Sequence, residues 1–498
     1  MNQTTLILSP EKAYDAEQRY RVVKRSIDAR QKQLKVHLTV LTDEHRAPLP
    51  KDAPIPLYEP PHFQDVHNAE HSVAIIGAGP AGLFAALTLI EHGIRPIIYE
   101  RGKEVAERKK DIATLNRNLG LNAESNYCFG EGGAGTFSDG KLFSRSKKRG
   151  NMQRVMELFH HFGGDDRLLY EAHAHIGSDK LPTIIRRMRE CILEHGGEIH
   201  FSTCVDESLF SSLIASSPHR HIATILAIGH SAHDTYHMLH TNGVALATKG
   251  FAMGVRAEHP QSLINKLMYH DPSPELIRLV GNASYSLVTQ VQGRGVYSFC
   301  MCPGGHIVPA GSALNSCVVN GMSASHRNSP YANSGMVVEI RPEDLSEQDP
   351  LAGLRFQQHL EYLSYQHGGE PSLAPTQRLR DFVEGKVSKT LPSCSYLPGT
   401  VSSRLDQWLP EHIGKRLQQG FRDFDRKYRG FLTNEAVILG VESRSSSAVR
   451  LPRDPETLQS ISTPYLYPCG EGAGYAGGIT SSALDGINVA LKIAEQKD

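Results

Sequence analysis

The sequence between residues 71 and 100 restricts the possible folds more than any other part of the chain. The apolar, β-branched run Val73–Ile76 is suited to a buried parallel strand. Gly-Ala-Gly-Pro-Ala-Gly follows at once at residues 77–82 and matches the pattern GxGxxG. Residues 83–91 favour a helix, and residues 96–100 favour a second strand. A strand, a glycine turn, a helix and a second strand in this order predict a Rossmann-type α/β unit that binds a dinucleotide.

Each glycine of this turn has its own physical role in such a unit. Gly77 allows the tight turn, Gly79 lets a pyrophosphate approach the backbone, and Gly82 lets the helix pack closely on the strand. Free N–H groups at the start of the helix attract the phosphates. Glu100 follows Gly82 after 17 residues, at the place of a ribose-binding acid that repels a 2′-phosphate, so NADP is disfavoured. A glycine turn in an α/β domain that binds nothing is the alternative. The candidate cofactor-binding residues of the unit are Gly77, Gly79, Pro80, Ala81, Gly82, Glu100 and Arg101.

A second glycine-rich loop, residues 469–479, lies near the C-terminus and is followed by an expected helix over about 480–495. A loop at a second helix N-terminus could meet the distal half of an extended cofactor and stabilise negative charge on a reduced flavin near N1 and O2. This arrangement favours FAD over NAD as the cofactor, with Glu471 as a partner of the ribityl chain. A loop packed for structural reasons alone is the alternative. The candidates here are Gly470, Glu471, Gly477, Gly478 and Ile479.

Composition excludes several classes of protein. Apolar residues make up 40% of the 498 residues and charged residues 21%, which excludes a disordered scaffold and a collagen-like rod. The 53 basic and 53 acidic side chains balance, which argues against binding nucleic acid through bulk charge. The eight cysteines are scattered, without a CxxC pair or a zinc-site spacing, so no metal site is expected. We expect a cytoplasmic protein without a membrane span, because the uncharged stretch Ser72–Ile90 is explained by the dinucleotide unit.

Composition shifts along the chain predict a discontinuous domain. Residues 1–65 are expected to form a small N-terminal α/β domain, helical over 14–30, followed by a proline-rich linker. Residues 66–250 are assigned to the first part of the FAD-binding domain, and residues 431–498 to its C-terminal part. Residues 251–430 are assigned to an inserted mixed β/α domain that faces the substrate. The expected fold class is therefore α/β: a discontinuous Rossmann-type FAD-binding domain with one insertion and a small N-terminal domain.

Several segments together resemble a known family. They are the GxGxxG unit, Phe129–Leu142, CGEGAGYAGGITSSALDGI at the C-terminus, Arg25–Arg30, Ser298–Gly305 and Val441–Arg450. Over essentially its whole length the chain resembles the FAD-dependent dehydrogenases often labelled NAD(FAD)-utilising dehydrogenases. The resemblance implies a glutathione-reductase-like FAD fold with an inserted second domain. In that wider superfamily the C-terminal loop carries Gly-Asp, whereas this chain has Gly470-Glu471.

The same resemblance implies further contacts with the cofactor. The strand that ends at Gly229 would return the chain to the FAD domain, and Val205 would meet the adenine through its backbone. The glycine loop after Phe129 would approach the pyrophosphate or the flavin, through Gly132, Gly133, Gly135 and Thr136. A merely flexible loop is the alternative.

Other chemistry-bearing residues give weaker signals. Cys128 has no neighbouring cysteine, which argues against flavin disulfide-reductase chemistry, and no second GxGxxG marks a stable NAD(P)H domain. Cys300 and Cys302 share a face if their segment is a strand, but small buried hydrophobes are the favoured interpretation. For His173 with His175, and for the basic run 141–149, a solvated loop is the favoured interpretation. Arg444 and Arg450 would face a substrate carboxylate or pair with acids of the fold.

The sequence thus predicts an FAD-dependent oxidoreductase that transfers hydride at flavin N5 to or from a small-molecule substrate. NAD(P)H is a candidate transient electron donor. An FAD-dependent RNA-modifying protein and a non-catalytic FAD-bound sensor are the alternatives, and the neutral charge balance argues against the first. No catalytic acid or base stands out.

Overall fold

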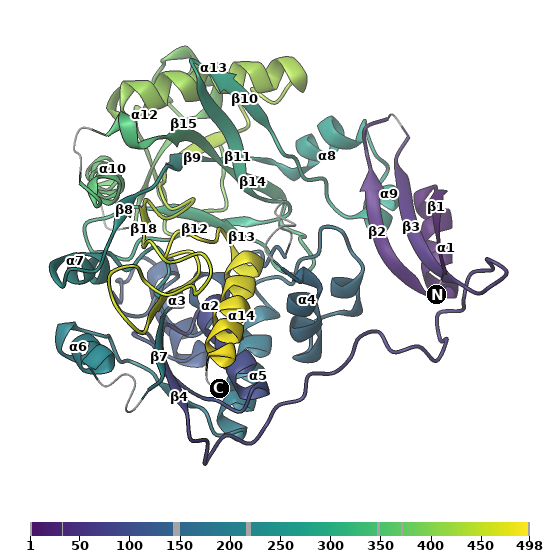
Figure 1. The fold of residues 1–498 in the computed structure, drawn as a ribbon. Helices are drawn as coiled ribbons and strands as arrows, with labels where there is room; N and C mark the ends of the chain where they lie inside the picture. The colour runs from purple at the N-terminus through teal and green to yellow at the C-terminus, as the bar shows by residue number, and fades with distance from the viewer. Residues whose placement is uncertain are drawn as a thin grey trace.

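The computed structural model describes residues 2–31, 33–142, 150–215, 221–345, 349–369 and 372–496. These residues form a small N-terminal unit and a larger body (Figure 1). The body contains a five-stranded parallel sheet, drawn in the lower half of Figure 1, and a seven-stranded mixed sheet above it. The expected mixed α/β fold with a parallel sheet is confirmed.

The N-terminal unit is a three-stranded antiparallel sheet covered by one helix. Its strands lie in the order β1-β3-β2, and they are β1 (Asn2–Leu8), β3 (Lys35–Thr42) and β2 (Val22–Asp28). The helix α1 (Pro10–Arg19) packs Ala13 and Ala16 on Val36, Leu38 and Val40, every second residue of β3.

The helix expected over residues 14–30 is wrong in its second half. The helix ends at Arg19, and residues 22–28 are strand β2, which pairs with β3 through Val22 and Ile27. β-branched side chains fit a pleated, half-buried surface better than a helix, and pairing with β3 overrides the charged composition of the segment.

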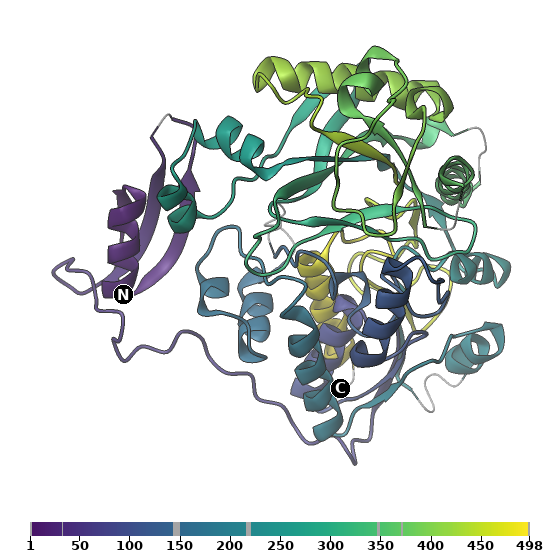
Figure 2. The same ribbon diagram turned by 180° about the vertical axis from the view of Figure 1, so that it is seen from behind.

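Residues 43–71 connect the N-terminal unit to the body along its outside, as Figures 1 and 2 show from opposite sides. A buried ion-pair cluster joins the two parts, because Arg25 Nε lies 2.7 Å from Glu17 and its Nη1 lies 3.0 Å from Glu171 of the body. The helix α9 (Pro274–Val280) also lies beside the unit.

The parallel sheet has the order β6-β5-β4-β7-β19, and all of its pairings are parallel. Its strands are β4 (Ser72–Ile76), β5 (Arg95–Tyr99), β6 (Glu198–His200), β7 (Ala223–Leu226) and β19 (Leu466–Pro468). Strand β19 comes from the C-terminal segment. From β4 the strands that come next in the chain, β5 and β6, lie on one side, whereas β7 and β19 lie on the other side. Ligands of open α/β sheets bind at the carboxyl ends of the strands near such a change of direction.

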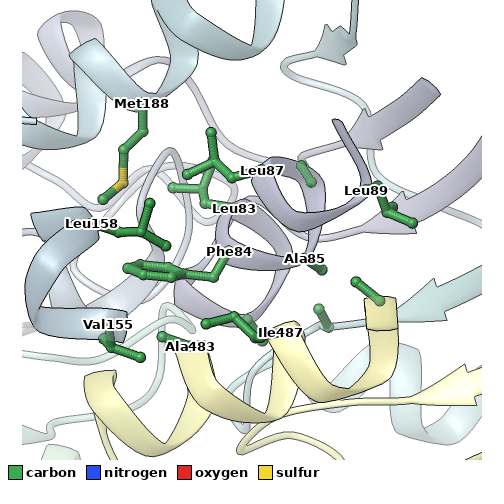
Figure 3. Close-up of a cluster of buried hydrophobic side chains, with 14 of the residues drawn as sticks. Leu83, Phe84, Ala85, Leu87, Leu89, Val155, Leu158, Met188, Ala483 and Ile487 are labelled. Atoms are coloured by element: carbon green, nitrogen blue, oxygen red, sulfur yellow. The ribbon is translucent and has the colours of Figure 1, made fainter. Parts of the chain in front are cut away.

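Helices α2 (Pro80–Glu91) and α14 (Ile479–Glu495) pack side by side on this sheet. Figure 3 shows Phe84 of α2 among Val155 and Leu158 of α4 (Met152–His161) and Ala483 and Ile487 of α14. Met188 of α5 (Leu181–Glu194) closes the cluster near Leu83. The helix α2 is apolar on every face because neighbours cover it on all sides.

The seven-stranded sheet has the order β10-β11-β14-β9-β17-β15-β16. Its strands are β9 (Phe251–Pro260), β10 (Val288–Val291), β11 (Arg294–Cys302), β14 (Tyr331–Ile340), β15 (Ala374–Arg378), β16 (Thr400–Ser402) and β17 (Val437–Glu442). The long helix α13 (Glu411–Lys427) covers this sheet at the top of Figure 1. Strand β17 lies beyond residue 430 yet pairs with β9, so the sheet extends past the boundary expected at 430.

The remaining elements connect these layers. They are α3 (Val105–Asn116), three 3-10 turns (Gly133–Gly135, Asp166–Leu169 and Pro342–Asp344), α6 (Glu207–Ala215), α7 (His233–Thr241), β8 (Ala247–Thr248), α8 (Gln261–Tyr269), β12 (His306–Pro309), β13 (Val319–Met322), α10 (Ala352–Gly368), α11 (Leu379–Glu384), α12 (Leu405–Trp408) and β18 (Val449–Arg450). Among the described residues, none of the helices combines the length and apolar character needed to cross a bilayer.

Candidate functional site

The first glycine turn connects β4 to α2 in the geometry that the sequence predicts. Gly77 has φ +108°, and a Cβ on it would lie 2.4 Å from the carbonyl oxygen of Ala227. A Cβ on Gly82 would lie 2.0 Å from the oxygen of Gly77, so only glycine allows the helix this close to the turn. Gly79 differs, because the nearest atom to its Cβ would be Gly133 Cα at 3.9 Å. Gly79 is also the N-cap of α2 and gives no side-chain cap, so the first N–H groups of α2 are left for a ligand.

Glu100 ties this turn to the next loops. Its Oε2 accepts a hydrogen bond from the N–H of Ala78 at 2.8 Å, and its Oε1 accepts from Gly102 at 2.8 Å and Gly130 at 2.9 Å. The side chain is buried. Because a carboxylate oxygen has two lone pairs, Oε2 retains capacity for one more donor, such as a ribose hydroxyl.

Arg101, the next residue, is held by neighbouring side chains. Its guanidinium pairs with Glu124 at 2.8 Å and Asp234 at 2.9 Å, and it lies 4.2 Å from the ring centre of Phe129. Its side chain therefore positions the start of the 129–136 loop.

The loop at residues 130–136 lies directly against the first turn. Gly132 N–H donates to Ala78 O at 2.8 Å, and a Cβ on Gly133 would lie 3.0 Å from Gly79 Cα. On its other side, a Cβ on Gly135 would lie 2.9 Å from Ile479 Cγ1 of α14. The Thr136 hydroxyl donates to Glu131 O at 2.9 Å and is buried, so it stabilises the loop from inside.

The C-terminal loop reaches the same place from the far end of the chain. Gly470 N–H donates to Asp485 Oδ2 of α14 at 2.7 Å, and a Cβ on Gly470 would lie 2.9 Å from Ala81 Cβ. In the part of the chain that the structure describes, no atom lies within 4 Å of the Cβ positions of Gly477 and Gly478, and Gly478 is the N-cap of α14 without a side-chain cap. Among these described residues, none fills the space in front of this second helix N-terminus.

Helices α2 and α14 fix these two N-termini relative to each other. A Cβ on Gly486 of α14 would lie 2.1 Å from Ala81 O, which shows how closely the two backbones approach. The glycine turns at 77–82 and 470–478, with the loop at 130–136, thus form one continuous surface at the carboxyl ends of β4 and β19. We call this surface the glycine cradle.

The two other sequence candidates, Val205 and Gly229, follow strands β6 and β7 of the parallel sheet. Val205 is buried among Ala74 and Ile76, so it can offer a ligand only its backbone. Gly229, with φ +68°, abuts the C-terminal loop, since a Cβ on Gly472 would lie 2.4 Å from Gly229 O. The Tyr236 hydroxyl of α7 donates a hydrogen bond to Gly472 O of the C-terminal loop at 2.7 Å.

Glu471 lies beside the cradle. Its carboxylate is 3.4 Å from Nδ1 of His230, and both side chains are largely buried. The Glu471 side chain therefore has a fixed partner on the strand-end loop after β7.

Three family models match parts of the chain. Residues 70–125 match the FAD binding domain, and residues 250–445 match the model described as FAD-dependent protein, C-terminal domain-like, which spans β9 to β17. Residues 12–42 match a domain of unknown function, DUF8436. An "Uncharacterized protein" of Clostridium beijerinckii is 40% identical to the chain, covering 96% of this chain and 92% of its own. The chain belongs to the same family as that protein. FAD is its cofactor.

Solved flavoprotein structures also resemble this FAD-dependent chain at a distance. CtdE in complex with FAD and substrate 4 is 11% identical, with 86% of this chain and 85% of that chain covered and a TM-score of 0.31. The flavin-dependent brominase Bmp2 is 14% identical, with 86% and 79% covered and a TM-score of 0.37. At these TM-scores the likenesses do not bear on the activity of this chain.

The residues of the glycine cradle fit FAD. An extended dinucleotide needs room at the backbone and helix N-termini that no side chain caps, and among the described residues the cradle offers both at Gly79 and at Gly478. Donor-rich turns at both ends suit a cofactor with a pyrophosphate in the middle and a polar ring at one end.

Two buried residues that shape the cradle escaped the sequence analysis. Arg108 of α3 is fully buried and donates to the carbonyls of Asn126, Tyr127, Gly130 and Glu131, so it holds the loop before Gly132. Burial lowers the pKa of Arg108 to about 10, which leaves it charged at neutral pH. Asp485 pairs with Arg453 at 2.7 Å and holds Gly470. Neither position has a local pattern, although Asp485 lies within the C-terminal segment that carries the family resemblance.

The other residues that the sequence analysis singled out lie outside the glycine cradle. Arg444 pairs with buried Glu361 at 3.0 Å, so of its two sequence interpretations the structure supports pairing within the fold. Arg450 lies 5.3 Å from the ring centre of Tyr475. His175 interacts with Ser325 O at 3.0 Å, and burial lowers the pKa of this histidine. Of the basic run 141–149, residues 143–149 lie outside the described residues.

Proposed function

We propose that the chain is an FAD-dependent oxidoreductase, a dehydrogenase or reductase that acts on a small molecule by hydride transfer at flavin N5. The observation that carries this proposal is the convergence of the glycine turns 77–82 and 470–478 on two uncapped helix N-termini. In this proposal the chain is one of the FAD-dependent dehydrogenases that the sequence resembles, with a Rossmann-type FAD domain. FAD supplies the redox chemistry when bound, and the chain binds and orients it.

In this proposal the first turn holds the phosphates. The N-terminus of α2 binds the pyrophosphate, and Gly79 leaves the room for it. The remaining lone pair of Glu100 Oε2 accepts a hydrogen bond from the adenosine ribose, and Val205 meets the adenine. Of the other residues of the first group, Pro80 and Ala81 begin α2 after the turn, and Arg101 positions the start of the 129–136 loop.

The second turn orients the reactive end of the cofactor. Gly478 and Ile479 begin α14, whose N-terminus favours negative charge on the flavin, while Glu471 meets the ribityl chain beside Gly470. The 132–136 loop lies between both turns and covers the cofactor, and Gly229 borders the C-terminal loop. The seven-stranded sheet is the proposed substrate side.

Anaerobic reduction of the full chain tests the proposal. The purified protein is expected to be yellow, and heating should release FAD in a 1:1 ratio to the chain. NADH, NADPH and dithionite are then added separately, and bleaching of the flavin absorbance is followed. Bleaching by a nicotinamide identifies the donor and supports the oxidoreductase. A flavin that only dithionite reduces contradicts the dehydrogenase and favours a sensor, and a chain that takes up no FAD contradicts the whole proposal.

A further inference from the structure

Cys300 and Cys302 of β11 lie in charged surroundings rather than in an apolar core. The Lys141 ammonium lies 3.9 Å from Cys300 Sγ and 3.7 Å from Cys302 Sγ. The guanidinium of Arg256 lies 3.6 Å from Cys302 Sγ and donates to Cys300 O at 2.8 Å. Since one ammonium reaches both sulfurs, both thiols lie on the same side of the strand. The favoured sequence interpretation, two small buried hydrophobes, does not account for two cations at these sulfurs.

The backbone of β11 is irregular at this pair. Phe299 pairs with Gly335 of β14, and the next pair is Cys302 with Asn333. Between these two pairs β11 advances by three residues and β14 by two, so β11 contains a β-bulge. Cys300 has φ +46°, a conformation that residues other than glycine rarely adopt. Such bulges re-aim side chains and occur next to functional sites.

The two thiols differ in access. Cys302 is fully buried, whereas Cys300 is partly exposed. Of the two residues only Cys300 has solvent-exposed surface, so it is the one that a dissolved reagent approaches. This is the arrangement of an attacking and a resolving cysteine in thiol–disulfide exchange.

The charges around the pair stabilise one thiolate. A hydrogen bond between the two cysteine side chains lowers the pKa of Cys300 well below its usual value, burial opposes this, and Lys141 and Arg256 lower it further. The same hydrogen bond raises the pKa of Cys302, and burial adds to the rise. Asp139, 3.5 Å from Lys141, and Glu442, 2.9 Å from Arg256, partly offset the two cations.

A metal site does not explain the cluster. Among the residues that the structure describes, no group of three or more His, Cys, Asp or Glu side chains could hold a metal ion. All eight cysteines are free thiols.

We propose that Cys300 and Cys302 form a redox-active dithiol that reduces low-molecular-weight disulfides. The Cys300 thiolate attacks one sulfur of the disulfide RSSR, forms a mixed disulfide with RS and releases RS⁻. Cys302 then loses its proton to the released thiolate, and its sulfur attacks Cys300 and releases the second RS⁻. Two protein sulfurs lose two electrons in total, and RSSR gains them as RSH and RS⁻. Lys141 and Arg256 are positioning residues that stabilise the thiolate.

Glutathione disulfide is the probe for this exchange. The full-length, FAD-loaded chain is reduced, freed of reductant, incubated with glutathione disulfide and mapped by peptide mass spectrometry after acid quenching. We expect a peptide with a Cys300–Cys302 bond, lighter by two hydrogens, and two glutathione thiols released per chain. Cys302→Ser is expected to trap glutathione on Cys300. A wild-type map without this bond overturns the proposal whether or not the variants fold.

Alkylation rates test the charge stabilisation separately. With iodoacetamide at pH 6, Cys300 is expected to react more than about tenfold faster than Cys204, because only a thiolate reacts. Cys204 is the internal control, since it is an exposed residue whose pKa is raised, with partial desolvation of the thiol as the largest cause. Lys141→Met should move the pH midpoint for Cys300 upward, whereas Lys141→Arg should keep it low. Faster reaction of Cys204 at pH 6, or an unchanged midpoint in Lys141→Met, contradicts the proposal. Neither readout depends on hydride transfer by FAD.

Discussion

Two glycines of the first turn, Gly79 and Gly82, separate cofactor binding from folding. A methyl group on Gly82 would lie 2.0 Å from Gly77 O and 3.1 Å from Gly77 C, both backbone atoms. Of the described atoms, the one nearest to a methyl group on Gly79 would be Gly133 Cα at 3.9 Å. Gly79 has φ −75° and ψ −175°, which any residue adopts. Gly82→Ala therefore clashes within the folded chain, whereas Gly79→Ala occupies only the space assigned to the pyrophosphate.

The magnitudes follow from these distances. Folded proteins show essentially no Cβ contact under 3.0 Å, so Gly82→Ala forces a displacement of about 1 Å, and overpacking of this kind costs about 1–3 kcal/mol. Gly79→Ala loses about 0.5–1 kcal/mol as an N-cap, because alanine caps less well than glycine, but gains about 0.4–1 kcal/mol from the unfolded chain, so its net effect on stability is near zero. Displacing one phosphate hydrogen bond worth about 1.5–3 kcal/mol lowers FAD affinity about 10- to 150-fold.

The assay pairs two measurements on each variant. Denaturant unfolding of the flavin-free chain reports stability, and quenching of FAD fluorescence reports affinity. Gly79→Ala should keep the wild-type unfolding midpoint and bind FAD weakly, whereas Gly82→Ala should lose both. If Gly79→Ala binds FAD as tightly as the wild type, or unfolds as early as Gly82→Ala, the assignment of the pyrophosphate to this turn is refuted.

Three further predictions concern buried polar groups. Burial raises the pKa of Glu258 from 4.5 to about 7, so the folded chain holds this proton more tightly than the unfolded chain. Stability should then fall by up to about 3 kcal/mol from pH 4.5 to pH 7, and denaturant unfolding of Glu258→Gln should show a smaller fall. Arg25→Ala leaves buried Glu17 without its cation, should cost about 3–5 kcal/mol, and should speed limited proteolysis in residues 43–71; an unchanged cleavage rate would count against docking through this pair. Glu100→Gln places an amide NH₂ against a backbone N–H in either orientation, so the unfolding free energy of the flavin-free chain should drop by about 1–3 kcal/mol, and an unaltered midpoint would contradict its clamping role.

The sequence predicted the elements whose causes are local. Gly77 and Gly82 carry their own steric reason, and the strand Val73–Ile76 before them and the helix after them are visible as apolar runs. The helix that begins at Ile479 was predicted to within one residue for the same reason, because a glycine pair precedes it. Such short-range signals need no knowledge of the partner across the sheet.

Features that depend on distant partners were not predictable. The strand β17 belongs to the seven-stranded sheet only because it pairs with β9, almost 180 residues earlier, and nothing in the local sequence indicates that this sheet continues beyond residue 430. Arg108 is indistinguishable in sequence from a solvated helix residue, and only the fold shows four carbonyls around it. The charged surroundings of Cys300 and Cys302 were likewise not predictable, because they come from Lys141, which lies 159 and 161 residues away in the sequence.

The segment 132–142 links the glycine cradle to the thiol pair. Its glycines lie against Gly79 and Ile479, and the carbonyl of Leu142 accepts a hydrogen bond from the Thr480 hydroxyl in the first turn of α14 at 2.9 Å. Lys141 is adjacent to that contact but directs its ammonium to the sulfurs. The two proposals therefore predict opposite effects of two substitutions.

Gly79→Ala is expected to lose FAD and keep rapid alkylation of Cys300, because it touches no residue of the thiol cluster. Lys141→Met is expected to keep FAD and lose that reactivity, since its backbone contacts are unchanged and only the ammonium is removed. Both are measured on the same preparations, by flavin absorbance and by iodoacetamide modification at pH 6. If one substitution abolishes both properties while the unfolding midpoint stays at the wild-type value, the cradle and the thiols form a single site, and the separation argued from these distances fails.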